Sequence, residues 1–318
     1  MRDGAWKASL GLPALGTAAI TVALVLLPID RRLAMEILLV LAMAQGWNLL
    51  CGYTGLLSFG HQAFVGLGAY VLFMVVNTTG VSPLWSILAA ALVALAVALI
   101  MWVLLRRLRG AYFSIGIWVL ADSLRLLFAQ WDWVGSSRGM VLSATSIDAT
   151  SFADTVFVLA LGLAFATQLG VFALLRSRTG LALMAIRDNE AGAASVGISV
   201  ARNQLAAFLI SAAVCAVAGA IYYLSVLYVD PTGAFDIDWQ IRVLFIVIVG
   251  GLGTVEGPIV GIVIYFGLRE LFRDAGDLFL IFQGATAFAV PLIMPGGIWG
   301  LIHARTGWQL FPTRRLAE

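Results

Sequence analysis

The segment from Leu84 to Leu105 reads "LWSILAAALVALAVALIMWVLL" and carries no charged residue over 22 positions. A helix needs about 20 consecutive apolar residues to cross the hydrocarbon core of a bilayer, so this segment predicts a membrane span. Similar segments recur along the whole chain, which is 62% hydrophobic and has a mean hydropathy of +1.00. Charged residues make up 11%, against about 25% in soluble domains. The composition therefore predicts a polytopic helical membrane protein.

We expect an all-α fold, a transmembrane helical bundle of eight to ten spans that forms a single transmembrane domain over residues 1–318. The segment near 239–257 is short and interrupted by glycine, which is typical of a half-helix or a re-entrant segment. The first apolar run is too long for a signal-peptide core and is expected to be a retained span. The expected spans are 10–28, 33–51, 56–77, 83–105, 111–131, 154–176, 203–225, 239–250, 257–273 and 277–294.

The charges in the connections predict the orientation, because cytoplasmic loops are enriched in Lys and Arg. With a cytoplasmic N-terminus, the C-terminus is cytoplasmic too, loop 177–202 lies inside and loop 132–153 lies outside. Three arginines, Arg31, Arg32 and Arg138, do not follow this arrangement. The expected inner cations are Arg2, Lys7, Arg106, Arg107, Arg109, Arg176, Arg178, Arg187, Arg202, Arg305, Arg314 and Arg315, and the expected outer acids are Asp30, Asp132, Asp148, Asp154, Asp230, Asp236 and Asp238.

Loop 177–202 contains the stretch "GLALMAIRDNEAGAASVGIS", residues 180–199, which is polar for this chain. The pattern predicts a short amphipathic helix over 182–196, with Thr179 as a cap at its start and Gly197 at its end. Arg187 and Glu190 are spaced to pair on one face. Such a helix either lies on lipid headgroups or docks on a partner, and its small residues favour the close approach of another backbone.

The sequence contains no recognisable catalytic or metal-binding motif. A Walker A loop needs a lysine to hold nucleotide phosphates, and the only lysine, Lys7, has no such context. Cys51 and Cys215 are expected to be small buried hydrophobes. We therefore expect a protein that is not an enzyme, with no cofactor, no metal and no nucleic-acid partner.

Several polar residues fall within the expected spans, where an isolated charge costs about 2.5–3.5 kcal/mol on insertion scales. Asp122 and Arg125 are three residues apart and form either a structural ion pair or part of a substrate path. His61 is either a hydrogen-bonded strut or a gate. Glu36 and Glu256 are expected near the membrane interfaces. The candidate pathway residues of this kind are Asn48, His61, Gln62, Asp122 and Arg125.

Glycines cluster where helices are expected to cross or break. One group is Gly60, Gly66 and Gly68, and the other includes Gly250, Gly251 and Gly253. Small residues allow helices to pack closely in lipid, and broken helices are tolerated where protein or a cavity covers the backbone. The stretch 250–258 is therefore either a re-entrant turn that lines the pathway or a site of tight packing.

Five blocks of sequence resemble the permease subunits of branched-chain amino-acid ABC importers, the LivM-type family. They follow one another in the order found in that family and cover about residues 33 to 301. The blocks are "GYTGLLSFGHQAFVGLGAY" (52–70), "GAYFSIGIWVLADSLRLL" (110–127), "GLALMAIRDNEAGAASVGISVARNQLAAFLISAAVCAVAGAIYY" (180–223), "VIVGGLGTVEGPIVG" (247–261) and "PLIMPGGIWGL" (291–301).

The resemblance implies an ABC permease in the cytoplasmic (inner) membrane of a bacterium. In that family the cytoplasmic loop carries a Glu-Ala-Ala…Gly motif that docks on the ATPase, and Glu190, Ala193 and Gly197 occupy the matching positions. Arg187 and Asp188 belong to the same expected docking surface. The implied partners are a second homologous permease, cytoplasmic ATP-binding subunits and an extracytoplasmic substrate-binding protein.

The resemblance also implies a substrate class, namely branched-chain or other hydrophobic amino acids. Relatives that import urea or short amides share these blocks, so that alternative stays open. In place of a Thr-Gly-Gly stretch, this chain has "WVGSSRGM" at 133–140, where Arg138 is compatible with a carboxylated substrate.

Two other classes of protein compete with this interpretation. An ion-coupled secondary transporter predicts intramembrane acids that bind ions, for which Asp122 is the candidate. A structural subunit of a membrane enzyme predicts cofactor ligands, which the sequence does not contain.

Overall fold

The computed structural model describes residues 30–143, 149–273, 278–294 and 296–307. These residues contain thirteen α-helices, of which six are long and apolar enough to cross a membrane. They match the second to the seventh expected span, whereas the first, 10–28, lies outside the described residues. The six are α2 (Arg31–Thr54), α3 (Gln62–Thr79), α4 (Pro83–Leu105), α5 (Ala111–Gln130), α6 (Ala149–Leu175) and α9 (Val200–Val226).

The last three expected spans are shorter helices: α11 (Ile237–Gly250), α12 (Gly257–Leu271) and α13 (Leu278–Ile293). They have 14, 15 and 16 residues. At 1.5 Å per residue each is about 21–24 Å long, less than the hydrocarbon core of about 30 Å. The length of α11 agrees with the half-helix expected near 239–257. A last helix, α14 (Gly297–Thr306), follows α13.

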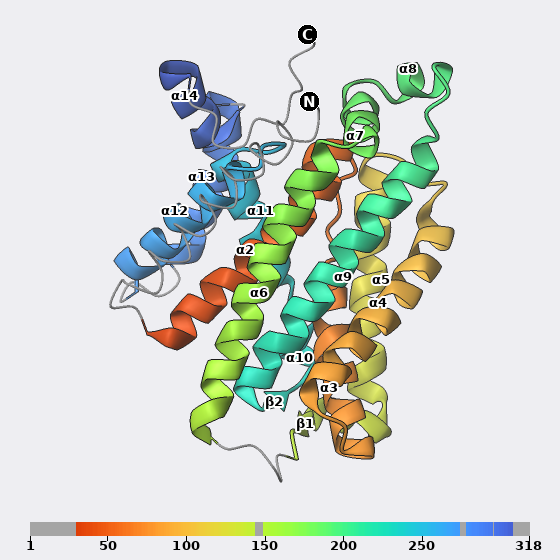
Figure 1. Ribbon diagram of the computed structural model, residues 1–318, viewed down its shortest axis with the longest axis vertical. Coiled ribbons are helices and arrows are strands. Elements are labelled where there is room, and N and C mark those ends of the chain that lie inside the picture. Colours follow the sequence, from red (N-terminus) through yellow and green to blue (C-terminus); the bar gives the residue numbers. More distant parts are fainter. Residues whose placement is uncertain (1–29, 144–148, 274–277, 295, 308–318) are drawn as a thin grey trace, which may run out of the picture.

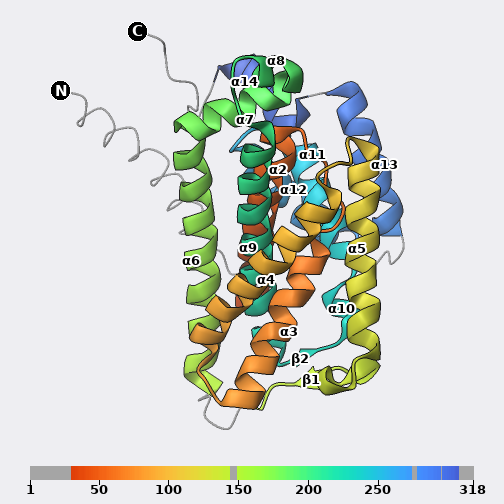
Figure 2. The ribbon, with the colours of Figure 1, turned by 90° about the vertical axis from the view of Figure 1, so that its right-hand side faces the viewer.

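The connections gather at the two ends of the bundle. The short helices α7 (Arg178–Asp188) and α8 (Glu190–Ser195) lie at the same end as α14, and the two strands lie at the opposite end (Figures 1 and 2). The side of the membrane that each end faces stays a prediction.

Over the described residues the fold is all-helical as expected, apart from one short ladder at the strand end. β1 (Met140–Val141) pairs antiparallel with β2 (Tyr228–Val229), and Met140 lies opposite Val229. The one-turn helix α10 (Pro231–Ala234) follows β2, and two 3-10 turns, η1 (Asp132–Val134) and η2 (Ser136–Arg138), precede β1. The sequence reading missed this ladder because two-residue strands have no periodicity to detect.

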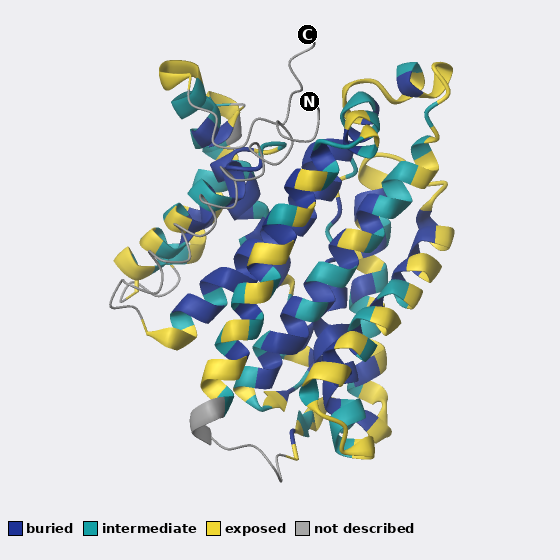
Figure 3. Ribbon diagram, viewed as in Figure 1, coloured by how far each residue is buried: buried dark blue, intermediate teal, exposed yellow. Residues whose placement is uncertain are grey.

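The core is built around α2, whose residues are buried from Ile37 to Thr54. Figure 3 shows buried residues along α2 and α9 in the middle of the bundle. The α3–α9 crossing is close because a Cβ at Gly68 would collide with the Ala216 carbonyl, and one at Gly219 with the Val65 carbonyl. Small residues at a crossing let the two backbones meet, so dispersion contacts stabilise the pair where lipid gives no hydrophobic driving force.

The third expected span was 56–77, but its helix, α3, begins only at Gln62. Residues 55–61 connect α2 to α3 and are not helical. This segment passes inside the bundle, where Trp47 Nε1 donates to the Ser58 carbonyl at 2.8 Å. Gln240 Oε1 accepts a hydrogen bond from the His61 amide at 3.2 Å. Buried backbone groups need partners of this kind where no helix supplies them, so side chains of α2 and α11 replace the missing turn.

Candidate functional site

The polar loop between α6 and α9 folds into two helices, α7 and α8, rather than the single helix expected over 182–196. The Ser177 hydroxyl, and not Thr179, caps α7 by accepting a hydrogen bond from the Gly180 amide at 3.3 Å. Asn189 has an extended backbone, and its Oδ1 accepts from the Gly192 amide at 2.9 Å. An Asn at this position interrupts one helix and caps the next, which explains the break. We call α7 and α8 the coupling helices, after the ATPase-docking role that the family resemblance predicts for loop 177–202.

The end of α8 agrees with the sequence, and its side chains divide between two faces. Gly197 terminates α8 with a φ of 88°, a left-handed conformation that favours glycine. Ala193 is 4% exposed, so it packs within this chain and is not itself a surface for a partner. Glu190, Ala194 and Val196 are exposed and form the outer surface of α8.

The expected pair between Arg187 and Glu190 does not form. Glu190 Oε1 lies 3.8 Å from Arg109 Nη2 in the connection between α4 and α5, and Arg187 Nη2 lies 3.0 Å from Asp188 Oδ1. Both pairs are exposed, and such pairs contribute about 0–1 kcal/mol. The break at Asn189 turns Glu190 away from the face of Arg187, so the i,i+3 spacing does not apply.

The connection between α11 and α12, which we call the 251–256 turn, is bound to α2 by side chains. Asn48 Nδ2 donates to the Thr254 carbonyl at 2.7 Å, and Asn48 Oδ1 accepts from the Gly253 amide at 2.9 Å. Gln45 Nε2 donates to the Val255 carbonyl at 2.6 Å. Four of the expected pathway residues, Asn48, Gly250, Gly251 and Gly253, therefore lie together.

Gly250 and Gly253 have different tasks in this hairpin. A Cβ at Gly250 would collide with the Gly257 carbonyl, so this glycine permits α11 and α12 to pack closely. Gly253 has a φ of 74°, a region that costs a residue with a side chain about 1–2 kcal/mol. Gly250 therefore permits tight packing and Gly253 permits the turn, while the prediction that this turn lines a pathway stays untested.

His61 and Gln62 lie elsewhere, where the non-helical segment meets α3. His61 is 2% exposed, its Nδ1 lies 3.0 Å from Ser58 Oγ, and its Nε2 lies 2.7 Å from Ser211 Oγ of α9. Both ring nitrogens are engaged, and the ring packs edge-on against Phe64 and Phe208. The geometry is that of a hydrogen-bonded strut, and a role in the pathway stays a prediction.

Asp122 and Arg125 lie on α5, at the side of the bundle (Figure 2). Arg125 Nε donates to Asp122 Oδ1 at 2.7 Å, and the two side chains are 33% and 47% exposed. The neighbouring helix α4 exposes Leu88, Leu92 and other large apolar side chains. The outer face of α5 exposes large apolar side chains as well, among them Ile115 and Leu126. It differs from α4 in carrying an ion pair, whose charges call for a cover of protein or water within a membrane.

Sequence reasoning missed a second charged group, which we call the Glu36 cluster: Glu36, Asp238, Arg242 and Arg269. Glu36 Oε1 accepts from Arg242 Nη1 at 3.0 Å and from Arg269 Nη1 at 2.8 Å. Arg242 also donates to Asp238 Oδ2, from Nη2 at 2.5 Å. The Glu36 side chain is only 13% exposed, and its expected position near a membrane interface stays a prediction.

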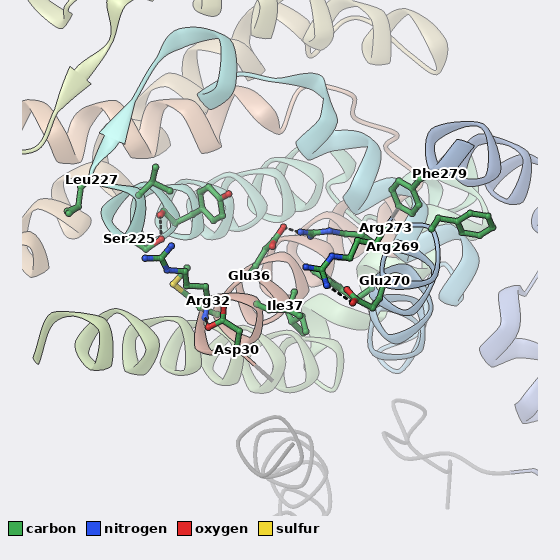
Figure 4. A pocket seen from close by; sticks show the side chains of 16 residues that line it. Asp30, Arg32, Glu36, Ile37, Ser225, Leu227, Arg269, Glu270, Arg273 and Phe279 are labelled. Atoms are coloured by element: carbon green, nitrogen blue, oxygen red, sulfur yellow. Dashed lines mark hydrogen bonds and ion pairs between the residues drawn. The ribbon is translucent and has the colours of Figure 1, made fainter. Parts of the chain in front are cut away.

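The cluster lies beside a cavity of about 1270 Å³ that α2, α9, α12 and α13 line. Figure 4 shows Glu36 and Arg269 pointing toward one another there, with Arg273 and Glu270 close by. Glu256, the other expected interface acid, is 5% exposed and lies in the 251–256 turn. No group of three or more potential metal ligands occurs in the described ranges.

Comparison with known proteins places the chain in a family. The family model described as branched-chain amino acid transport system / permease component matches residues 31–291. The chain belongs to this family, and it is accordingly a multi-pass transport permease and not an enzyme. No solved structure was found to match it.

Individual relatives are distant. The high-affinity branched-chain amino acid transport system permease protein LivM of Salmonella typhimurium (strain LT2) is 26% identical over 286 residues, or 80% of this chain. LivM of Escherichia coli (strain K12) is 26% identical over 281 residues, also 80% of this chain. The chain spans 66% of the length of each of these two relatives. LivH of Salmonella typhimurium is 27% identical over 290 residues, which cover 81% of this chain and 90% of that protein.

Proposed function

We propose that this chain is the membrane-spanning permease subunit of a binding-protein-dependent ABC importer and that separate ATP-binding subunits dock on the coupling helices. The observation that carries the proposal is the construction of α7 and α8. Two short helices, capped by Ser177 and Asn189, stand at one end of the bundle, together with α14 and the 251–256 turn. Their exposed side chains include small, charged and apolar residues, which suits a docked protein.

The exposed side chains of α7 and α8 support a docking surface. Glu190, Ala194 and Val196 are exposed, and Leu181 of α7 is 53% exposed. Ala193 is buried and supports α8 from inside. A helix that only lay on headgroups would present a continuous face of bulky apolar anchors, whereas the exposed residues here include an acid and an alanine as well as two apolar side chains.

The α5 face supports a second part of the proposal, a partner permease. The Asp122–Arg125 pair is half-exposed near the middle of a 20-residue helix. Bare lipid is a costly environment for these charges. A homologous permease that faces α5 across a polar translocation path would cover them, and it would place Asp122 and Arg125 beside the substrate.

The docking test compares two outward-facing substitutions with matched controls at the strand end. Glu190→Arg reverses a charge and Ala194→Trp adds bulk where a cleft must close. Asp132→Arg and Ser137→Trp make the same kinds of change at exposed positions of η1 and η2. All four should reach the membrane normally. We expect only the first two to lose co-purification with the ATP-binding subunits, and equal co-purification by all four would contradict the docking surface.

The proposed substrate class is branched-chain or other hydrophobic amino acids. The test is binding of leucine, isoleucine, valine, urea and acetamide to the partner substrate-binding protein, followed by uptake in vesicles that contain the assembled importer. Binding and uptake of the three amino acids would support the assignment. Binding and uptake of urea or acetamide alone would replace it with the short-amide alternative and leave the ABC architecture intact.

A further inference from the structure

The guanidinium of Arg187 contacts the end of a spanning helix, although the side chain is 38% exposed. Its Nη1 donates to the Gly52 carbonyl near the end of α2 at 3.2 Å, and its Nε donates to Asp188 Oδ1 at 3.0 Å. A Cβ at Gly253 would lie 2.8 Å from the same Nη1. Arg187 therefore lies between the end of α2 and the 251–256 turn.

The end of α2 and the 251–256 turn meet here as one packed unit. A Cβ at Gly52 would lie 2.6 Å from the Gly253 amide nitrogen, so the two backbones touch with no room for a side chain. Asn48 fixes the turn through both the Nδ2 and the Oδ1 atom of its side-chain amide. A displacement of the turn therefore changes the position of the Gly52 carbonyl that Arg187 holds.

The same turn joins the two short helices α11 and α12. Glycines bring these helices into backbone contact, since a Cβ at Gly261 would collide with the Ile246 carbonyl. Closely packed helices move together rather than deform. Movement at the turn would therefore be passed to both helices as a unit.

We propose that Arg187 is a positioning residue that links α7 to the 251–256 turn, so that movement of the coupling helices shifts α11 and α12. The inference rests on the proposed function, because docked ATP-binding subunits supply the movement. Arginine suits this task, since its planar fork holds the Gly52 carbonyl and Asp188 at once, which a lysine ammonium does less well.

The experiment uses the assembled importer and a cysteine reporter in the turn. Leu252 is 43% exposed, and Cys51 and Cys215 are buried, so Leu252→Cys in a Cys51→Ala, Cys215→Ala background gives a single accessible thiol. Its reaction rate with a water-soluble maleimide is measured without nucleotide and after trapping with ATP and vanadate. We expect the rate to change on trapping when Arg187 is present.

Arg187→Leu should keep ATP-binding subunits bound and ATP hydrolysis running. Trapping should no longer change the reaction rate at the Leu252→Cys position, and uptake per ATP should fall by about 3- to 30-fold, the range expected for a lost coupling contact. Arg187→Lys should fall between the parent and Arg187→Leu. The matched control is Arg107→Leu, an exposed arginine in the connection between α4 and α5 at the same end of the bundle, which should behave like the parent.

Two results would overturn the link. One is a nucleotide-dependent reaction rate and normal uptake per ATP in Arg187→Leu. The other is loss of ATP-binding subunits in Arg187→Leu but not in Arg107→Leu, because Arg187 would then act in docking. Failure of the parent chain to bind ATP-binding subunits is a different outcome, and it would contradict the proposed function itself.

Discussion

The Glu36 cluster and the Asp122–Arg125 pair both place charges among apolar helices, yet they are built in opposite ways. Glu36 draws together α2, α11 and α12, and its side chain is 13% exposed. Asp122 and Arg125 belong to a single helix, and their side chains are 47% and 33% exposed. The first is an internal clamp within this chain, and the second is a local pair on an outward face.

A charge within a span therefore does not by itself mark a translocation pathway. A buried cluster binds helices to one another, and its loss leaves charges without partners in a low dielectric. A half-exposed pair stabilises the chain little but needs a cover when the helix lies in a membrane. Substitutions in the Glu36 cluster should therefore lower the stability of the chain more than substitutions in the Asp122–Arg125 pair. In transport measurements the order should be reversed.

The largest expected effect is that of Glu36→Gln. The substitution leaves Arg242 and Arg269 without their shared carboxylate, and removing one partner of a buried pair typically costs about 3–5 kcal/mol. Arg242 keeps Asp238 and the Arg269 side chain is 42% exposed, so we expect a loss near or below the lower value. Thermal unfolding of the purified chain in detergent should show a marked fall in melting temperature, with a lower membrane yield. An unchanged melting temperature would mean that the cluster is not a clamp.

Asp238→Asn should have an intermediate effect. Arg242 loses the negative charge of the carboxylate that accepts from its Nε at 2.8 Å but keeps Glu36. A hydrogen bond to a charged group contributes about 1.5–3 kcal/mol, and the partial exposure of Asp238 places the loss near the lower value. The same unfolding assay checks this, and a loss as large as that of Glu36→Gln would show that Asp238 is the main anchor.

Asp122→Asn should change chain stability by less than about 1 kcal/mol, as expected for an exposed i,i+3 pair. Uptake by the assembled importer should nevertheless fall, because the substitution alters the face proposed to meet the path. The two readouts are melting temperature and vesicle uptake. A large loss of stability that an exchange of the two charges restores would make the pair structural and remove it from the pathway.

Glu270→Gln is expected to have the smallest effect. Its partner Arg273 lies 3.0 Å away, and both side chains are largely exposed, so the pair contributes about 0–1 kcal/mol. Melting temperature and uptake should match those of the parent. Because Glu270 borders the same cavity as Glu36, it is the matched control for the Glu36 substitution.

The sequence could predict what depends on neighbours along the chain. Hydropathy found six long spans, and the length of the 239–250 run predicted the short α11. Gly197 was correctly expected at the end of α8. The i,i+3 spacing of Asp122 and Arg125 was enough to predict their contact.

What the sequence could not predict depends on distant residues or on competing caps. Glu36 is 206 residues from Arg242 and 233 from Arg269, so no local pattern joins them. The break at Asn189 was missed because a cap within a polar loop competes with continued helix. The non-helical start of the third span depends on Trp47 and Gln240, whose roles emerge only when α2 and α11 are packed beside it.

We propose that transport by this chain is driven by ATP-binding subunits docked on its coupling helices. The direct measurement is uptake of radiolabelled leucine, valine or isoleucine into vesicles that contain the purified chain and its partner permease, with and without the ATP-binding subunits, the substrate-binding protein and internal ATP. We predict uptake only when all components and ATP are present, no loss when ionophores collapse the ion gradients, and no uptake with Glu190→Arg. Uptake by this chain alone, driven by an ion gradient without ATP, would contradict the claim and identify a secondary transporter.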